Sequence, residues 1–311
     1  MYLNLDTKTI YFMEFQEPLL MIIDANSLAH RAFHALPPLT TKNGRLVNAI
    51  YGFFSIFFKA LRDLKPVFVV TAFDSPAPTF RHQVFQDYKA TRPKTPEPFL
   101  QQLPQIKEIL AMMTIKVFEK PGLEADDIIG SVAFSVEKKS QSPAPKVIIL
   151  SSDTDLLQLV SEKTKVLILK RGISETVLYD EATVQKRYQG LTPKQLIDFK
   201  ALRGDPSDNI PGVFGVGEKT AISLIGRFQT LENLYSSLGQ KDVKKSLKSS
   251  VFDKLVAQKE KAFLSQSLAR IRCDEELGFS LEGCLWQGYD KKKLSTVFGE
   301  LEFFSLLSRL P

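Results

Sequence analysis

The feature of this 311-residue chain that most constrains its fold is a set of three short apolar segments, each of which ends in an aspartate. They are residues 19–24 (LLMIID), 67–74 (VFVVTAFD) and 146–153 (KVIILSSD). Both alternating faces of each segment are apolar, as in strands buried inside a parallel sheet. Helical patterns lie between them, so strand and helix alternate along the chain. We therefore predict an α/β fold with a mostly parallel central sheet flanked by helices.

The aspartates that end these segments are Asp24, Asp74 and Asp153. A single aspartate after a strand is explained equally well as a cap of the next helix. In an open parallel sheet, however, the carboxyl ends of the strands meet at one edge, where the binding cleft of such folds lies. Three aspartates at that edge predict an acidic cleft.

Further segments add carboxylates to this set. Residues 122–127 (GLEADD) open a predicted helix, although the helix dipole alone would favour one or two acids there. Residues 153–155 (DTD) follow a strand, and residues 204–209 (GDPSDN) precede a glycine-rich run. The nine candidate carboxylates are Asp24, Asp74, Glu124, Asp126, Asp127, Asp153, Asp155, Asp205 and Asp208.

A cleft that gathers so many acids needs positive charge, because crowded carboxylates repel one another and their pKa values rise. The three histidines, His30, His34 and His82, are not spaced as a metal set, and Cys273 and Cys284 form no zinc motif. Magnesium prefers a few carboxylates together with water and phosphate oxygens. We therefore predict a site for hard divalent cations, Mg²⁺ or Mn²⁺, with two or more bound together.

Composition and hydropathy narrow the class of partner. A net charge of +6 and a pI near 9.1 favour an anionic partner. No signal peptide or membrane span is visible in the sequence, so we expect a cytoplasmic protein with no membrane partner. After about residue 190 the strand signals give way to helical patterns, which predict a helical subdomain behind the core.

Several motifs occur in an order and spacing that resemble the 5′ nuclease domain of bacterial DNA polymerase I. Flap endonucleases and phage 5′ exonucleases are more distant relatives, and the resemblance covers roughly residues 19–310. The motifs are Ile23-Asp24, residues 73–82 (FDSPAPTFRH), Tyr88-Lys89 with Arg92, residues 122–127 (GLEADD), residues 153–156 (DTDL) and residues 204–220 (GDPSDNIPGVFGVGEKT).

The resemblance implies a division of the chain into parts. Residues 1–18 would form an N-terminal extension. Residues 19–190 would form a PIN-like nuclease core with a helical arch at about 80–100. Residues 191–295 would form a helical DNA-binding subdomain, with a hairpin of the helix and three-turn helix type at about 204–222. Residues 296–311 would form a C-terminal helix. All nine carboxylates would be metal ligands, and hairpin carbonyls would hold K⁺.

It also implies roles for basic and glycine residues. Lys89, Arg92 and Arg31 would act as catalytic cations at the scissile phosphate, and Tyr88 would stack on a base. Glycines would allow close backbone approach to DNA, and the helix that follows would bind a phosphate at its N-terminus. The implied DNA contacts are Arg81, Tyr88, Lys89, Arg92, Gly212, Gly215, Gly217, Lys219 and Thr220.

The function that the resemblance implies is 5′-3′ exonuclease and 5′ flap endonuclease activity by a two-metal mechanism, in primer removal and repair. The partner would be DNA with a 5′ flap, overhang, nick or RNA primer. The chain would be a monomer at the bacterial nucleoid, either beside a DNA polymerase or as part of one. Ala25, Leu123 and Thr154 depart from the family pattern, which we expect to affect rate and substrate preference rather than reaction type.

Two other functions are compatible with an acidic cleft. The chain could be a branched-DNA-binding scaffold without catalysis. It could also be a ribonuclease of the related acid-cleft fold class, which is disfavoured because a small ribonuclease would lack the hairpin and the basic segment at 81–94.

Overall fold

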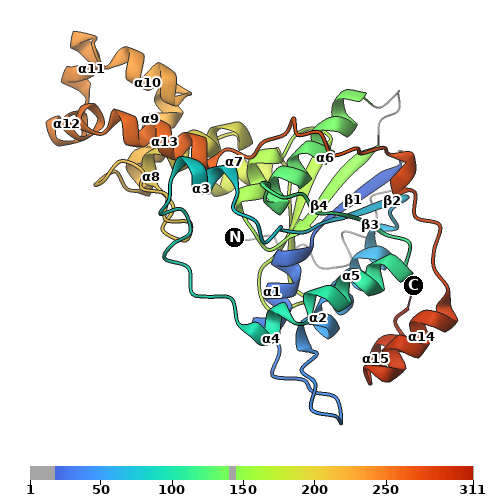
Figure 1. Ribbon diagram of the computed structural model, residues 1–311. Coiled ribbons are helices and arrows are strands. Elements are labelled where there is room, and N and C mark those ends of the chain that lie inside the picture. Colours follow the sequence, from blue (N-terminus) through green and yellow to red (C-terminus); the bar gives the residue numbers. More distant parts are fainter. Residues whose placement is uncertain (1–17, 140–144, 311) are drawn as a thin grey trace.

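The computed structural model describes residues 18–139 and 145–310, so residues 1–17 of the expected N-terminal extension lie outside it. Its centre is a six-stranded sheet with the strand order β3-β2-β1-β4-β5-β6 (Figure 1). The strands are β1 (Leu19–Asp24), β2 (Phe68–Ala72), β3 (Lys116–Phe118), β4 (Lys146–Ser151), β5 (Thr164–Leu169) and β6 (Thr176–Tyr179). All neighbours are parallel except β5 and β6. The predicted mostly parallel α/β sheet is confirmed.

Strand β1 has a neighbour on each side in the sheet, and every one of its six residues is buried. Side chains alternate between the two faces of a strand. Leu19, Met21 and Ile23 accordingly pack into one core layer, and Leu20 and Ile22 pack into the other. The apolar pattern on both faces thus specifies a strand that is covered on both sides.

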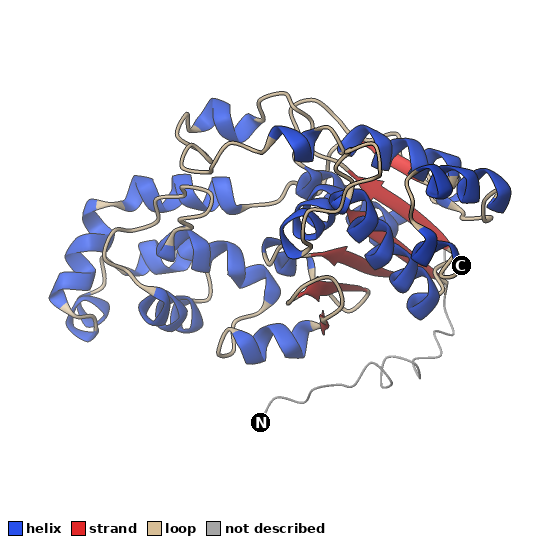
Figure 2. Ribbon diagram, turned by 90° about the horizontal axis from the view of Figure 1, so that it is seen from below, coloured by secondary structure: helices blue, strands red, loops and turns tan. Residues whose placement is uncertain are grey.

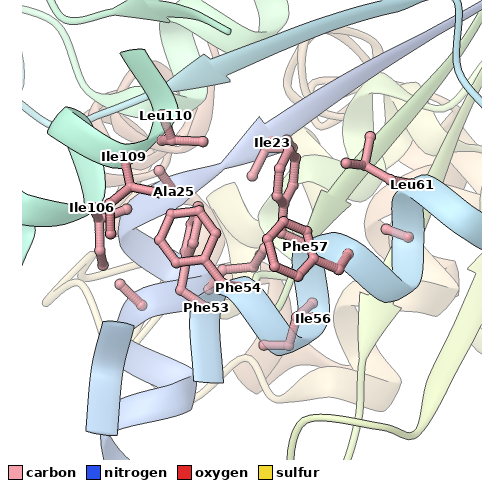
Figure 3. Packing of buried hydrophobic residues seen from close by; sticks show 14 of the residues in the cluster. Ile23, Ala25, Phe53, Phe54, Ile56, Phe57, Leu61, Ile106, Ile109 and Leu110 are labelled. Carbon is pink, nitrogen blue, oxygen red and sulfur yellow. The ribbon is translucent and has the colours of Figure 1, made fainter. Parts of the chain in front are cut away.

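The first face of the sheet is covered by α1 (Ala25–Ala35), α2 (Asn48–Leu64) and α5 (Leu103–Met112). Helices α14 (Lys291–Glu300) and α15 (Phe304–Leu307) pack against α5 and α2. Phe53, Phe54 and Phe57 of α2 belong to one buried cluster with Ile23 of β1 and the α5 side chains (Figure 3). The sequence predicted one C-terminal helix at 296–311. The structure has two helices there, α14 and α15, and α14 begins five residues before 296, at Lys291.

Gly52 lets α1 and α2 approach closely, because a Cβ there would lie 2.5 Å from the Cβ of Ala32. The opposite face of the sheet is covered by α6 (Ala125–Lys139), α7 (Glu181–Arg187) and the 3-10 helix η2 (Asp155–Leu159). In Figure 1, α6 lies on the other side of the strands from α1, α2 and α5. None of the helices in the described ranges is both long and apolar enough to cross a membrane.

The predicted helical region after residue 190 forms a lobe with its own core, at the end of the molecule away from the strands (Figure 2). Its helices are η3 (Pro193–Gln195), α8 (Leu196–Arg203), α9 (Glu218–Phe228), α10 (Leu231–Ser237), α11 (Lys241–Ser246), α12 (Ser249–Ala257) and α13 (Lys259–Ala269). The chain after α13 runs back along the core through the 3-10 helix η4 (Glu282–Cys284), and Trp286 donates its backbone N–H to Val67. The lobe helices therefore end well before residue 295.

The segment at 80–100 differs from the expected helical arch. Only α3 (Phe80–Val84) and α4 (Glu97–Leu100) are helical, and turns and extended chain connect them. Pro93 and Pro96 lack the N–H that a helix needs, and each disfavours a helical residue before it. Lys89 has a φ of 58°, which also interrupts a helix. We call residues 80–96 the gateway segment.

Candidate active site

The carboxyl edge of the sheet begins with Asp24, the last residue of β1, which is 3% exposed. It caps α1 by accepting the backbone N–H of Ser27 at 3.1 Å, and it accepts the hydroxyl of Ser151 at 2.6 Å. Burial, together with the charges of Asp74 and Asp153, raises the pKa of Asp24 to about 7 even though these hydrogen bonds lower it. Asp24 is thus both the helix cap and a member of an acidic cluster.

Helix α6 brings its first turn to the same edge. Asp74 accepts the backbone N–H of Ala125 at 2.8 Å, which ties the end of β2 to the start of α6. Burial raises the pKa of Asp126 well above its usual range, and the charges of Asp153, Asp24, Glu124 and Asp155 raise it further. The predicted convergence of acids from separate segments is therefore present in the structure.

A second group of acids is held around Lys200 of α8. Its ammonium forms ion pairs with Asp155 and, at 2.6 Å, with Asp205. Burial and then the charge of Asp153 raise the pKa of Asp155 to about 7, against the effect of Lys200. Burial would raise the pKa of Asp205, but Lys200 and Ser207 lower it overall.

Asp127 differs from the prediction that it is a metal ligand. It is completely buried, and Arg81 donates to both of its oxygens at 2.8 and 2.9 Å. Backbone N–H groups of Glu124 and Arg272 donate to the same two oxygens at 3.2 and 3.0 Å. With all these donors in place, Asp127 has no open side for a cation, and we remove it from the expected ligands.

Arg81 differs in the same way from the expected DNA contact. It is 2% exposed, and besides Asp127 it donates to the carbonyl oxygens of Leu268 and Arg270, both at 2.9 Å. These bonds join the gateway segment, α6 and the chain that leaves the helical lobe. Arg81 is therefore a structural link rather than a surface cation.

Tyr88 was expected to stack on a base, but the structure places it inside. It is 3% exposed, and its hydroxyl donates to Glu124 at 3.2 Å and to Asp208 at 3.1 Å. Burial and the charges of these two acids raise its pKa. The ring therefore positions two acids and has no open face for a base.

Lys89 and Arg92 do reach the acids, as expected of cations near the reacting group. The Lys89 ammonium lies 2.9 Å from Glu124, and the Arg92 guanidinium forms an ion pair with Asp208. Arg31 instead donates to the backbone oxygen of Leu169 at 3.5 Å. Across residues 18–139 and 145–310 it forms no ion pair, so the structure does not place it with the acids.

The glycine-rich hairpin connects α8 to α9 directly after the second acid group. Gly212 has a φ of 62°, and a Cβ there would lie 2.3 Å from the backbone nitrogen of Gly204, so only glycine fits. Gly215 has a φ of 83°, and Gly217 precedes α9 as its N-cap. Lys219 is exposed and Thr220 is half-buried in the first turn of α9, whose free N–H groups suit a phosphate.

Comparison with family models covers most of the chain. Residues 19–189 match the 5′-3′ exonuclease N-terminal resolvase-like domain, and residues 191–292 match the 5′-3′ exonuclease C-terminal SAM fold. The chain belongs to the 5′-3′ exonuclease family.

Relatives of this family member include DNA polymerase I of Bacillus subtilis (strain 168), which is 44% identical over 291 residues, covering 94% of this chain and 32% of the relative. DNA polymerase I of Lactococcus lactis subsp. lactis (strain IL1403) is 40% identical over 300 residues, covering 94% of this chain and 33% of the relative. The chain thus spans about a third of the length of these polymerases.

Solved structures share the exonuclease fold. T5 5′-exonuclease with bound zinc ions aligns with a TM-score of 0.65 and 21% identity, over 91% of this chain and 99% of that one. The catalytic core of Rad2 in complex with DNA substrate aligns with a TM-score of 0.59 and 17% identity, over 93% of this chain and 89% of that one. At these identities the likeness shows the fold alone.

Protein cations take up part of the space between the carboxylates of this exonuclease-family chain. Within the part of the chain that the structure describes, no three His, Cys, Asp or Glu side chains are arranged so that they could hold one metal ion. Lys200 separates Asp155 from Asp205, and Lys89 covers Glu124. The acids are gathered, but their side chains would have to rotate to coordinate a cation.

Lys200 and the serines around Asp24 are site residues that sequence reasoning missed. Lys200 is one of many basic residues on predicted helices, and nothing in its immediate sequence marks it. The signal was its place at the end of a helix that leads into residues 204–209, because that puts its ammonium close to the loop acids.

Proposed function

We propose that this chain hydrolyses DNA phosphodiester bonds at or near 5′ ends, as a 5′-3′ exonuclease and flap endonuclease. The observation that carries the proposal is the cluster of carboxylates with raised pKa values at the carboxyl edge of the sheet, which Lys89 and Arg92 reach from the gateway segment. Family membership supports the same reaction.

The acid cluster fits divalent cations by its chemistry. Its donors are all oxygens. Burial, and then the neighbouring carboxylates, raise the pKa values of Asp24, Asp126 and Asp155, so ionising these three acids is unfavourable unless positive charge is added. Such a donor set suits Mg²⁺ or Mn²⁺. The proposed ligands are Asp24, Asp74, Glu124, Asp126, Asp153, Asp155, Asp205 and Asp208. Bound there, two such cations would stabilise charge on the scissile phosphate and lower the pKa of the attacking water.

Lys89 and Arg92 would bind the phosphate of the substrate. Both already lie at ion-pair distance from proposed ligand acids, so a phosphate held at those acids would be within their reach. A phosphate oxygen would replace the carboxylate as the partner of each cation, which keeps the charge balanced. Their role would be to orient the phosphate and to stabilise the negative charge that develops on it.

The hairpin and the start of α9 would hold the duplex part of the substrate through phosphate contacts. Gly212, Gly215 and Gly217 would let the DNA backbone approach, Lys219 and Thr220 would bind a phosphate, and hairpin carbonyls would hold K⁺. A T5 flap endonuclease variant of the same fold has been solved in a pseudo-enzyme-product complex with DNA and metal ions, which supports binding of DNA by this chain.

The substrates would be DNA with a 5′ flap, overhang, nick or RNA primer. The relatives are DNA polymerases, so we propose that the chain acts in primer removal and repair next to a polymerase, fused to it or as its partner. It would work as a monomer at the bacterial nucleoid.

Cleavage of a 5′-labelled flap duplex tests the proposal. We expect short labelled products with Mg²⁺ or Mn²⁺ and none with EDTA. Asp153→Asn should abolish cleavage while duplex binding persists, and Asp253→Asn, an exposed acid on α12, is the matched control that should cleave normally. Tight binding by the wild type without any cleavage would support the scaffold instead, and cleavage of single-stranded RNA alone would support a ribonuclease.

A further inference from the structure

The hairpin presents an aromatic side chain to solvent. Phe214 is 83% exposed, more than any other large apolar residue in the described ranges. Its neighbours Val213 and Val216 are 1% and 3% exposed and belong to the core of the helical lobe. The side chains before and after Phe214, at Val213 and Val216, are therefore buried in the lobe, while the Phe214 ring faces solvent.

The position of this ring is fixed by its own backbone. The side chain of Gln258, at the junction of α12 and α13, accepts the N–H of Phe214 at 2.9 Å and donates to its carbonyl oxygen at 3.3 Å. Gly212 is tied to the lobe as well, because its N–H donates to Ser265 at 2.9 Å. Phe214 thus stands on an anchored turn rather than on a loosely held loop.

Two lysines lie on or beside the hairpin that carries the ring. Lys254 donates to the carbonyl oxygen of Gly215 at 3.3 Å, and Lys219 is exposed in the first turn of α9. The acid next to Lys219 is Glu218, which lies 3.8 Å from Arg203. An apolar tip with a cationic rim matches a nucleic-acid groove, where phosphates flank the apolar edges of the sugars.

We propose that Phe214 inserts into the minor groove of the duplex part of the substrate and packs against deoxyribose, while Lys219 and Lys254 contact the flanking phosphates. This inference rests on the proposed function, because it requires that the hairpin binds duplex DNA. It adds a specific side chain to the backbone contacts of the hairpin and assigns that side chain to double-stranded rather than single-stranded DNA.

A tryptophan at the tip tests the contact directly. The chain has one tryptophan, so Phe214→Trp combined with Trp286→Phe puts the only tryptophan on the hairpin, where its emission can be excited selectively. The double variant is titrated in EDTA with a labelled blunt duplex and with a single strand of the same sequence, and label anisotropy reports binding. We expect the duplex to change tryptophan emission clearly and the single strand to change it little.

The two readouts separate the possible failures. Binding of the duplex by anisotropy with unchanged emission would overturn the inference and leave the proposed function standing. An equal emission change with the single strand would overturn the assignment to duplex DNA. If no duplex bound at all, the proposed binding of duplex by the hairpin would fall, and the inference with it.

Deletion of the ring gives an independent test. Phe214→Ala should weaken duplex binding about tenfold, because burying a phenyl ring contributes roughly a decade of affinity or more. The salt dependence of binding should stay the same, since no charge is lost, whereas Lys254→Ala should reduce it. Phe304→Ala removes an equivalent ring, 65% exposed, from α15 of the core and is the matched control. Unchanged binding by Phe214→Ala, or an equal loss in the control, would contradict the inference.

Discussion

At the scale of single residues, two adjacent acids in one helical turn have opposite environments. Asp126 is half-buried within the acid cluster, and burial and neighbouring carboxylates raise its pKa. Asp127 is completely buried and ion-paired with Arg81. We expect the charge of Asp126 to serve function at a cost in stability, and the charge of Asp127 to stabilise the fold.

Asparagine substitutions should separate these roles. Asp127→Asn removes the closer of two carboxylates that pair with the buried Arg81 guanidinium and leaves Glu124, at 3.4 Å, as the remaining partner. This should lower the free energy of unfolding by about 3 kcal/mol. Asp126→Asn removes a repelling charge, so metal-free stability should be unchanged or higher while cleavage is lost. Urea denaturation in EDTA and the flap assay measure the two effects. A normally stable Asp127→Asn protein that fails to cleave would restore Asp127 to the proposed ligands.

Tyr88→Phe tests whether Tyr88 positions acids or stacks on a base. The substitution keeps the ring but removes the hydroxyl that donates to Glu124 and Asp208. We expect a loss of about 1 kcal/mol of stability, reduced kcat on the flap substrate and unchanged duplex affinity. A stacking role would instead leave Tyr88→Phe fully active, so the flap assay decides between them.

The sequence predicted which acids gather, but not how each one is used. Asp24, Asp74 and Asp153 could be placed because the ends of parallel strands share one edge of the sheet. The different environments of Asp126 and Asp127 could not be predicted. They occupy neighbouring helix positions, and only the residues that pack against α6 distinguish them. The partners of Asp127 lie far away in sequence, at Arg81 and Arg272.

At the scale of secondary structure, the gateway segment shows the limit of local patterns. Strands β1, β2 and β4 followed from their apolar patterns, whereas β3, β5 and β6 were not predicted. The gateway is held by contacts with residues more than 100 positions away. Lys89 donates its backbone N–H to the backbone carbonyl oxygen of Asp208, and its left-handed φ ends any helix there. These distant contacts, together with the prolines, replaced the expected arch with turns.

The gateway segment should loosen when divalent metal binds. Cations at Glu124 and Asp208 would displace Lys89 and Arg92, which now neutralise these acids. Amide hydrogen exchange at residues 85–92 should therefore become faster with Mg²⁺ than with EDTA. Strand β1, which is buried throughout, is the internal control and should not change. Slower or unchanged exchange at 85–92 would show that the segment is not held by the acids.

At the scale of the whole molecule, two cores meet around the acids. The sheet and its helices supply Asp24, Asp74, Glu124, Asp126, Asp153 and Asp155, and the lobe supplies Lys200, Asp205 and Asp208. The division near residue 190 was visible in the sequence, but the return of the chain after α13 along the sheet was not. Residues such as Ile271 and Cys284 look ordinary in sequence, and only the folded chain buries them in the core.

Because several acids in the cluster have raised pKa values, stability should depend on pH and metal together. Asp24 and Asp155 have pKa values of about 7, against about 4 in an unfolded chain, so their ionised forms destabilise the fold above pH 7. This penalty is full above pH 7 and shrinks as the pH falls below 7, because the folded acids then take up protons that the unfolded acids do not. The metal-free protein should therefore melt at a higher temperature at pH 6.5 than at pH 8.

Divalent metal should reverse that trend, because cations bind the ionised acids and neutralise them. Stabilisation by Mg²⁺ should consequently be larger at pH 8 than at pH 6.5, which thermal melting at both pH values with EDTA or Mg²⁺ would show. Asp24→Asn combined with Asp155→Asn should flatten both trends, and the exposed Asp253→Asn should not. Equal melting temperatures of the metal-free wild type at the two pH values would mean that burial and neighbouring carboxylates do not raise the pKa values of Asp24 and Asp155 in the folded protein.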